Sequence, residues 1–230
     1  MSASAHRRLH DPKVLQLHIK GNGNVSDYSG HGRHGTLVNS PTYAAGPFGH
    51  SCLELNGSTQ CITVGGLSFL DGATQVTFSC LFAQDSIASA QDRLFGRPQG
   101  ASSAEDRFLI LADNVAGFVV YVTNGGAASL SYARPSSWVN SAWVHFACVY
   151  DGTNAVAASR LSCYVNGQSV ASTSGAGTIP AAFPDLSDAD GAISDNTANF
   201  GFDGKMADVR LYSCALTGDE GAALYEWDRR

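Results

Sequence analysis

The chain has 230 residues, of which 44% are hydrophobic and 15% are charged, and its formal net charge is -6. This length and hydrophobic content suffice for one domain with a sizeable core. The acidic balance argues against nucleic acid and anionic membranes as partners, because both repel a negatively charged protein. The 25 glycines, together with runs rich in Val, Phe and Tyr, predict short strands joined by tight turns and hence an all-β fold.

Residues 1–12 are predicted to form an arm ahead of a single domain at 13–230. The arm contains basic residues but no apolar run that could serve as a signal-peptide core. No stretch approaches the length of a membrane span, so no membrane insertion is expected. We therefore expect the protein in the cytoplasm or in a virion released by lysis, and not secreted through a classical signal. A polar, basic arm is ordered only when a neighbour holds it, so an ordered arm would indicate a homo-oligomer or larger assembly.

Turn signals recur along the chain as an Asn or Asp followed by glycine, a pair that tolerates positive φ between β-prone runs. They occur at Asn56-Gly57, Asp71-Gly72, Asn124-Gly125, Asp151-Gly152, Asn166-Gly167 and Asp203-Gly204. They predict antiparallel hairpins that join 53–55 to 61–64, 117–123 to 129–132 and 143–150 to 161–165.

A short C-terminal helix is predicted by the capping box Thr217-Gly-Asp-Glu220. In this arrangement the threonine and the glutamate each bond to a backbone N–H group of the first helical turn. The helix is expected to continue through residues 221–225.

The six cysteines lack the spacing of a metal site, and the expected compartment is reducing. Cys80 and Cys148 lie inside strand-like runs, where a thiol behaves as a small buried hydrophobe. We therefore expect mostly free, buried thiols. Cys148 and Cys163 are the pair best placed to face one another, because a hairpin through Asp151-Gly152 joins their strands.

A series of ordered segments makes the chain resemble the concanavalin A-like lectin/glucanase superfamily, in its laminin-G-like branch, which is related to pentraxins. The resemblance covers nearly everything from about residue 13 onward. The segments are Leu15–Leu17, Asp27–Leu37, Pro41–Gly49, Leu53–Gly57, Val76–Phe78, Trp143–Ala147, Val149–Gly152, Tyr164–Gly167, Phe202–Tyr212, Ala215–Thr217 and Glu220.

The resemblance implies a two-sheet antiparallel jelly-roll sandwich with a curved face and variable loops at one rim. Members of this branch are mostly non-catalytic binding modules for glycans or protein surfaces, and calcium often steadies them. Retaining glycosidases on the same scaffold need two carboxylates on one face of a strand. Glu105 and Asp106 are adjacent and would point to opposite faces, so the chain is not expected to be an enzyme.

Calcium is an expected cofactor, because the resemblance places a ligand at Asp27, in a glycine-rich bend, and another acid on the late strand. The late strand departs from the family pattern: Ala207 replaces an acid, and Asp208 stands where the family has glutamate. The metal site would therefore use Asp27 and Asp208, if it is retained. The equal alternative is that Asp27 caps a turn by accepting backbone N–H bonds.

A second acidic cluster spans 185–195. Asp188 and Asp190 resemble part of an EF-hand loop, but Leu186 stands at the expected start and Thr197 where the bidentate glutamate belongs. A solvated loop is favoured over a metal site here.

Three histidines, His31, His34 and His145, are candidate functional groups. His31 and His34 lack a third ligand for a transition metal, so they are expected to face solvent. His145 is expected to be a hydrogen-bonded structural residue.

Ligand contact is predicted at an aromatic patch, because aromatic faces stack on sugar rings while nearby amides bond to hydroxyls. Trp138 is expected on a loop, with Tyr132, Tyr121 and Asn124 within reach of it. Trp143, by contrast, is expected in the core.

Two functions remain open. The first is a carbohydrate-binding or protein-surface-binding module that acts without chemistry. The alternative is a structural virion protein, such as a phage capsid-decoration or tail-associated protein, that uses the same fold to adhere to other subunits. The arm at 1–12 is the sequence feature that favours the second.

Overall fold

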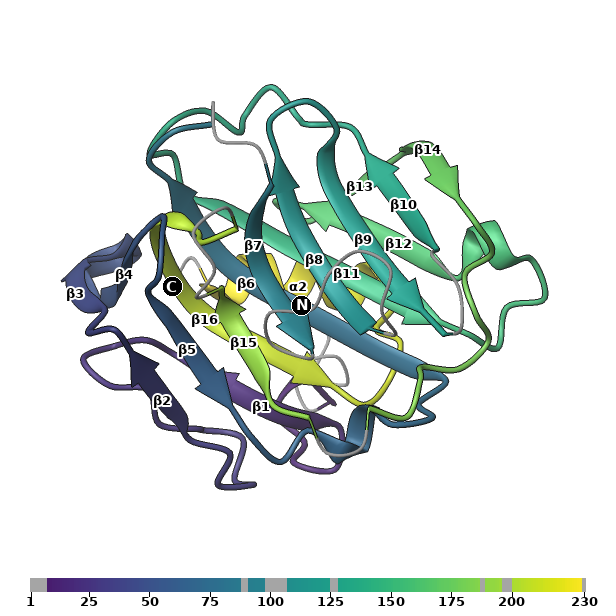
Figure 1. The fold of residues 1–230 in the computed structure, drawn as a ribbon, viewed down its shortest axis with the longest axis horizontal. Helices are drawn as coiled ribbons and strands as arrows, with labels where there is room; N and C mark the ends of the chain where they lie inside the picture. The colour runs from purple at the N-terminus through teal and green to yellow at the C-terminus, as the bar shows by residue number, and fades with distance from the viewer. Residues whose placement is uncertain are drawn as a thin grey trace.

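The computed structural model describes residues 8–87, 91–97, 107–124, 128–186, 189–195 and 200–228. Two eight-stranded antiparallel sheets face each other in a sandwich, and helix α2 (Gly218–Asp228) follows the last strand. In Figure 1 the second sheet lies toward the viewer, the first sheet lies behind it, and α2 lies behind the first sheet. The predicted jelly-roll sandwich with a C-terminal helix is confirmed. No helix in the described ranges has the length and apolarity to cross a membrane.

The first sheet contains, in spatial order, β13 (Gln168–Val170), β12 (Leu161–Val165), β11 (Val144–Asp151), β6 (Gln75–Gln84), β16 (Asp203–Tyr212), β4 (Ser51–Asn56) and β3 (Thr42–Ala45), with β1 (Leu15–Ile19) also paired to β16. The second contains β14 (Ser172–Ala176), β10 (Ser129–Tyr132), β9 (Gly117–Thr123), β8 (Arg107–Asp113), β7 (Asp92–Arg97), β15 (Gly191–Ser194), β5 (Cys61–Val64) and β2 (Gly35–Val38). Short 3-10 turns lie at η1 (Pro47–Gly49), η2 (Ser68–Leu70) and η3 (Ala157–Ser159).

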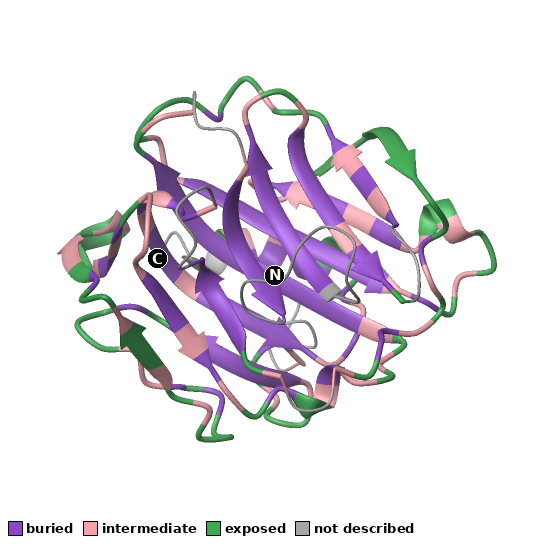
Figure 2. Ribbon diagram, viewed as in Figure 1, coloured by how far each residue is buried: buried purple, intermediate pink, exposed green. Residues whose placement is uncertain are grey.

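One core fills the space between the sheets, and Figure 2 shows it as a continuous buried band across both. Side chains alternate along each strand, so in β6 Phe78 and Phe82 point into the core while Ser79 lies on the outer face. The ring of Phe118 stacks on Phe146 with 4.2 Å between centroids, which links the two sheets. Aromatic pairs of this kind add specific geometry to the apolar burial.

Two of the predicted hairpins are confirmed, since β9 pairs with β10 and β11 pairs with β12. The hairpin predicted from 53–55 to 61–64 is wrong, because β4 lies in the first sheet and β5 in the second. The turn itself is present: Asn56 Oδ1 accepts the backbone N–H bonds of Ser58 and Thr59, at 3.1 and 3.3 Å. It carries the chain from one sheet to the other, a choice that the local Asn-Gly signal does not encode.

Asp203-Gly204 is not a turn between strands, as the sequence suggested, but the beginning of β16. Gly204 has a φ of 143°, and a Cβ there would lie 2.2 Å from the carbonyl oxygen of Ala83. Glycine is therefore needed for the close approach of β16 to β6.

All six cysteines are buried, and none of them forms a disulfide. Cys148 lies directly opposite Cys163 in the β11–β12 ladder, as the hairpin predicted. The compact thiols fill space between larger side chains of the core.

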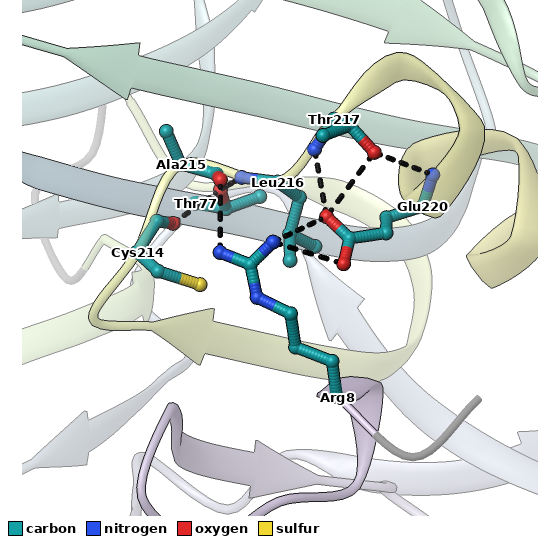
Figure 3. Close-up of polar contacts among 7 residues, drawn as sticks. All are labelled: Arg8, Thr77, Cys214, Ala215, Leu216, Thr217 and Glu220. Carbon is teal, nitrogen blue, oxygen red and sulfur yellow. Dashed lines mark hydrogen bonds and ion pairs between the residues drawn. The ribbon is translucent and has the colours of Figure 1, made fainter. Parts of the chain in front are cut away.

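The N-terminal segment packs against the helix end. Thr217 and Glu220 form the predicted capping box, with 2.8 Å from Thr217 N to Glu220 Oε2 and 3.3 Å from Glu220 N to Thr217 Oγ1. Figure 3 shows the guanidinium of Arg8 reaching both oxygens of Glu220, at 3.0 and 2.9 Å, and the carbonyl of Ala215. Leu9 is buried beside Leu224. The described part of the predicted arm, residues 8–12, thus packs on the domain, and residues 1–7 lie outside the described residues.

Candidate ligand-binding site

The structure corrects the predicted aromatic patch. Trp138 is 1% exposed and its ring stacks on Phe118, with 4.7 Å between centroids. Tyr132 is 2% exposed and belongs to the same core. Neither ring offers a face to a ligand, because both pack among the buried side chains of the main core.

Tyr121 and Asn124, unlike Trp138 and Tyr132, reach the surface of the protein. Tyr121 is partly exposed on the outer face of the second sheet, where it packs beside Val119 and Leu111. Asn124 is exposed just after the end of β9. Their ligand role stays a prediction. Trp143, expected in the core, is only partly buried and packs on the outer face of the first sheet against Leu81 and Ala207.

Asp27 organises the bend between β1 and β2. Its Oδ1 accepts the backbone N–H bonds of His18 and Ser29, at 3.0 and 2.9 Å. Its Oδ2 accepts from the hydroxyl of Ser29 at 2.8 Å and from the N–H of Arg33 at 3.0 Å. Burial raises the pKa of Asp27, but these hydrogen bonds outweigh it and hold the pKa below its ordinary value. Asp27 thus caps a turn by accepting backbone N–H bonds, which was the alternative to a role as a calcium ligand.

Calcium fits this arrangement poorly. N–H and O–H donors surround Asp27, whereas calcium needs converging oxygen lone pairs. Asp208, the other predicted ligand, contacts the opposite end of His18, through the ring. Among the described residues, no three His, Cys, Asp or Glu side chains gather as a metal site requires. Calcium binding stays a prediction without a recognisable ligand set.

Other predicted positions have structural roles. His34 Nδ1 accepts the backbone N–H of Asp27 at 3.1 Å, and His31 Nε2 lies 2.8 Å from the carbonyl of Pro12. His145 is fully buried, and its ring lies 5.9 Å from that of Tyr225 on α2. From the acidic cluster, Asp195 is buried and ion-paired with Arg93.

Glu105, Asp106, Asp188 and Thr197 lie outside the described residues.

A cavity of about 470 Å³ opens on the outer face of the first sheet, at the edge formed by β1 and β4. Its floor comes from the strands: His18 on β1, and Ala207, Asp208 and Arg210 on β16. The volume is in the range of small-molecule sites in proteins.

The rim of the cavity comes from segments far apart in the sequence. It is made by His10, Lys20, Asn22, Tyr28, Pro47, Phe48, His50 and Ser51. His10 belongs to the N-terminal segment that Arg8 anchors to α2.

A β-bulge in β16 presents the floor. β16 pairs with β4 up to Met206 and with β1 from Val209 onward, so its partner changes between them. Asp208 takes a φ of 50°, and its N–H donates to the carbonyl of Lys20 at 3.2 Å. The extra residue lets both Ala207 and Asp208 line the cavity while Met206 and Val209 stay in the core.

On the floor of the cavity, Asp208 is hydrogen-bonded to both His18 and Arg210. Asp208 Oδ1 lies 2.8 Å from His18 Nε2 and 3.0 Å from Arg210 Nη2. Burial raises the pKa of Asp208, but the Arg210 charge and the His18 bond outweigh it and lower the pKa. Burial, with the nearby Arg210 charge, lowers the pKa of His18. An ionised carboxylate only accepts hydrogen bonds, so Nε2 of the neutral His18 ring carries the proton.

Two aromatic rings stand at the rim, with Tyr28 48% and Phe48 49% exposed. The Lys20 ammonium lies 4.6 Å from the centroid of the Tyr28 ring, a cation–π contact. Phe48 has a φ of 56°, an unfavourable conformation for an aromatic residue, within the tight turn η1. The turn is closed by the N–H of Gly46, which donates to the carbonyl of His50 at 2.7 Å.

Two side chains that line the cavity, Tyr28 and Ser51, carry hydroxyl groups. Ser51 is the hydroxyl side chain beside the histidines, and its Oγ donates to Asn22 Oδ1 at 2.7 Å. His18 Nε2 bonds to Asp208, and the hydroxyl of Ser51 bonds to Asn22 rather than to a histidine ring.

Lys20, Tyr28 and Phe48 were not predicted as site residues, although Tyr28 and Phe48 lie in the segments 27–37 and 41–49 that carry the resemblance. The available signal was an aromatic residue beside glycines in a turn, outside any alternating strand pattern.

Solved structures share this fold at low sequence identity. Domain 4 of AbnA, a GH43 extracellular arabinanase from Geobacillus stearothermophilus solved with arabinotriose, matches with a TM-score of 0.61 and 22% identity, covering 93% of this chain and 99% of that one. The binding domain of Paraclostridial Mosquitocidal Protein 1 matches with a TM-score of 0.71 and 13% identity, covering 94% and 53%.

A structure of botulinum neurotoxin type C, whose cell entry is dependent upon interaction with two ganglioside molecules, matches with a TM-score of 0.65 and 11% identity, covering 94% and 51%. The chain therefore spans about half the length of these toxin structures. No curated protein matches the chain significantly.

A family model, described as concanavalin A-like lectin/glucanases superfamily, matches residues 56–220. The match contains the segments named from the sequence from Val76–Phe78 to Glu220, whereas the segments before residue 53 lie outside it. The chain belongs to the concanavalin A-like lectin/glucanase superfamily.

Proposed function

We propose that the chain is a non-catalytic carbohydrate-binding module and that the cavity between β1, β16 and η1 is its ligand site. The observation that carries this proposal is the pair of half-exposed rings, Tyr28 and Phe48, beside a polar floor. Sugars present apolar C–H faces that stack on aromatic rings and hydroxyls that bond to polar groups. The cavity offers both kinds of surface.

The floor is arranged for recognition. Asp208 is held by His18 and Arg210, so its position is fixed before a ligand arrives. Preorganised polar groups bind at a lower entropic cost than mobile ones. Asn22 is likewise fixed, because it accepts bonds from both the N–H and the hydroxyl of Ser51.

The relatives support the same class of function. One of them is an arabinanase domain solved with an arabinose oligomer, and others are binding domains of protein toxins. A sialidase also shares the fold, with a TM-score of 0.62 over 32% of its own length.

A glycan array probed with the purified chain, in calcium and in EDTA, tests the proposal. We expect binding to a defined sugar that persists in EDTA, since Asp208 is the one carboxylate among the described residues that line the cavity. Binding that disappears in EDTA would restore calcium as a cofactor and Asp27 as a ligand. An array without any binding would contradict the carbohydrate-binding function.

The competing proposal is adhesion to a protein surface, including a structural role in a virion. One observation favours it: strand β14 lies at the edge of the second sheet, and all five of its residues are exposed and uncharged. Such an edge can pair with a strand of another chain. Light scattering after size exclusion distinguishes the proposals. A stable oligomer that Thr173→Lys disperses would support adhesion, and a monomer that binds sugar would support the lectin.

A further inference from the structure

We infer that the cavity selects an anionic sugar, one that bears a carboxylate or a comparable anionic group. This inference rests on the proposed carbohydrate-binding function and names the class of ligand. It comes from the charges that converge on the cavity, which differ in sign from the charge of the whole chain.

The cavity is locally cationic within an acidic protein. Lys20 and Arg210 both line it, whereas the formal net charge of the chain is -6. Of the described residues around the cavity, Asp208 is the one carboxylate. A concave site with one sign of charge concentrates ligands of the opposite sign.

The charge of the single carboxylate is already balanced by Arg210. Arg210 Nη2 and His18 Nε2 both contact Oδ1 of Asp208. The carboxylate of Asp208 therefore balances the positive charge of Arg210. No second carboxylate among the described residues of the cavity balances the positive charge of Lys20. Arg210 is also 2% exposed, so its charge is held in a fixed position below the cavity.

Lys20 is the cation that a ligand can reach. The described ion pairs do not include it: the acids near the first sheet, Glu54 and Asp85, pair with Lys205. Its ammonium lies instead over the ring of Tyr28 at the rim. A sugar stacked on a rim aromatic would place its anionic group within reach of this ammonium, where a charge-assisted hydrogen bond can form.

The histidines add hydrogen-bond donors without adding carboxylates. His10 enters the cavity from the N-terminal segment, and His50 enters it from the residue after η1. Imidazole N–H groups bond well to carboxylate oxygens. The cavity thus surrounds a ligand anion from several segments and opposes it only with the neutralised Asp208.

The test compares acidic oligosaccharides with their neutral counterparts on the same array. Sialylated, uronic-acid and sulfated glycans are each paired with the form that lacks the charge, and affinities are measured at low and at high salt. We expect the acidic member to bind at least tenfold more tightly, with the preference falling as salt screens the charges. The carboxylate and sulfate arms identify which anion is preferred.

Two lysine variants locate the effect. Lys20→Gln should reduce the preference for the acidic glycan about fivefold or more, whereas Lys205→Gln, a charge removal on β16 outside the cavity, should leave it unchanged. Equal affinity for acidic and neutral glycans would overturn the inference and leave the carbohydrate-binding function standing. An array blank for both would overturn both. Equal losses in the two variants would also contradict the assignment to this cavity.

Discussion

His18 and His145 lie on the same outer face of the first sheet, but only His18 reaches the cavity. Helix α2 covers His145, whose ring packs against Tyr225. Burial lowers the pKa of His145 to about 3, because an imidazolium there would lose its hydration. The same physical effect acts on both histidines, yet the groups above them give one a ligand-facing position and the other a structural one.

The buried His145 makes stability depend on pH. In the unfolded chain a histidine titrates near pH 6.5, whereas in the folded protein His145 titrates at about 3. Between these values the unfolded chain binds the proton and the folded chain does not, so the free energy of unfolding falls as the pH falls. Urea denaturation at pH 7.5 and 4.5 should show the wild type losing about 2 kcal/mol more than His145→Gln over this range.

A second buried group acts in the opposite direction. Burial raises the pKa of Asp92 to about 6, so its protonation favours the folded state as the pH falls below that value. Because Asp92 is common to both proteins, the difference between the wild type and His145→Gln isolates the histidine. Identical pH dependence in the two proteins would contradict a neutral, buried His145.

The strands and the helix that the sequence predicted correctly are those whose ends depend on residues close together in the chain. The capping box at Thr217 and Glu220 and the hairpin from β11 to β12 follow from residues close in the chain. The separation of β4 from β5 does not, because the Asn56 turn is the same whether the next strand pairs or crosses to the other sheet. Burial of Trp138 depends on Phe118 across the core, a long-range contact without a local signal.

The N-terminal segment and α2 stabilise each other through Arg8 and Glu220. Glu220→Ala removes both the capping box and the ion pair, so the free energy of unfolding should fall by about 1–2 kcal/mol. Arg8→Ala should cost less than about 1 kcal/mol, since its side chain is 40% exposed and water screens the pair. Chemical denaturation of the two variants and the double variant measures the coupling.

The double-mutant cycle separates the ion pair from the cap. In the double variant, the cost of losing Arg8 should shrink, because its partner is already absent. Strictly additive costs would show that the contact drawn in Figure 3 contributes no coupling energy.

The whole molecule assembles its candidate site from four separated segments. The residues before β1, the β1–β2 connection, η1 and the bulge of β16 meet only because β16 exchanges β4 for β1 along one edge. The sequence resemblance predicted the two-sheet sandwich that brings these segments together. It did not predict the cavity, because no short stretch contains more than a few of its residues, and the rim aromatics follow no periodic pattern.

The most direct measurement is calorimetric titration of the best array ligand into the wild type, Tyr28→Ala and Tyr121→Ala. Both variants remove a tyrosine that solvent reaches, but only Tyr28 lines the cavity. If the cavity is the carbohydrate site, Tyr28→Ala should lose about tenfold in affinity, the equivalent of one stacking contact, while Tyr121→Ala binds like the wild type. Loss of binding in Tyr121→Ala with Tyr28→Ala unaffected would place the ligand on the second sheet and contradict the account.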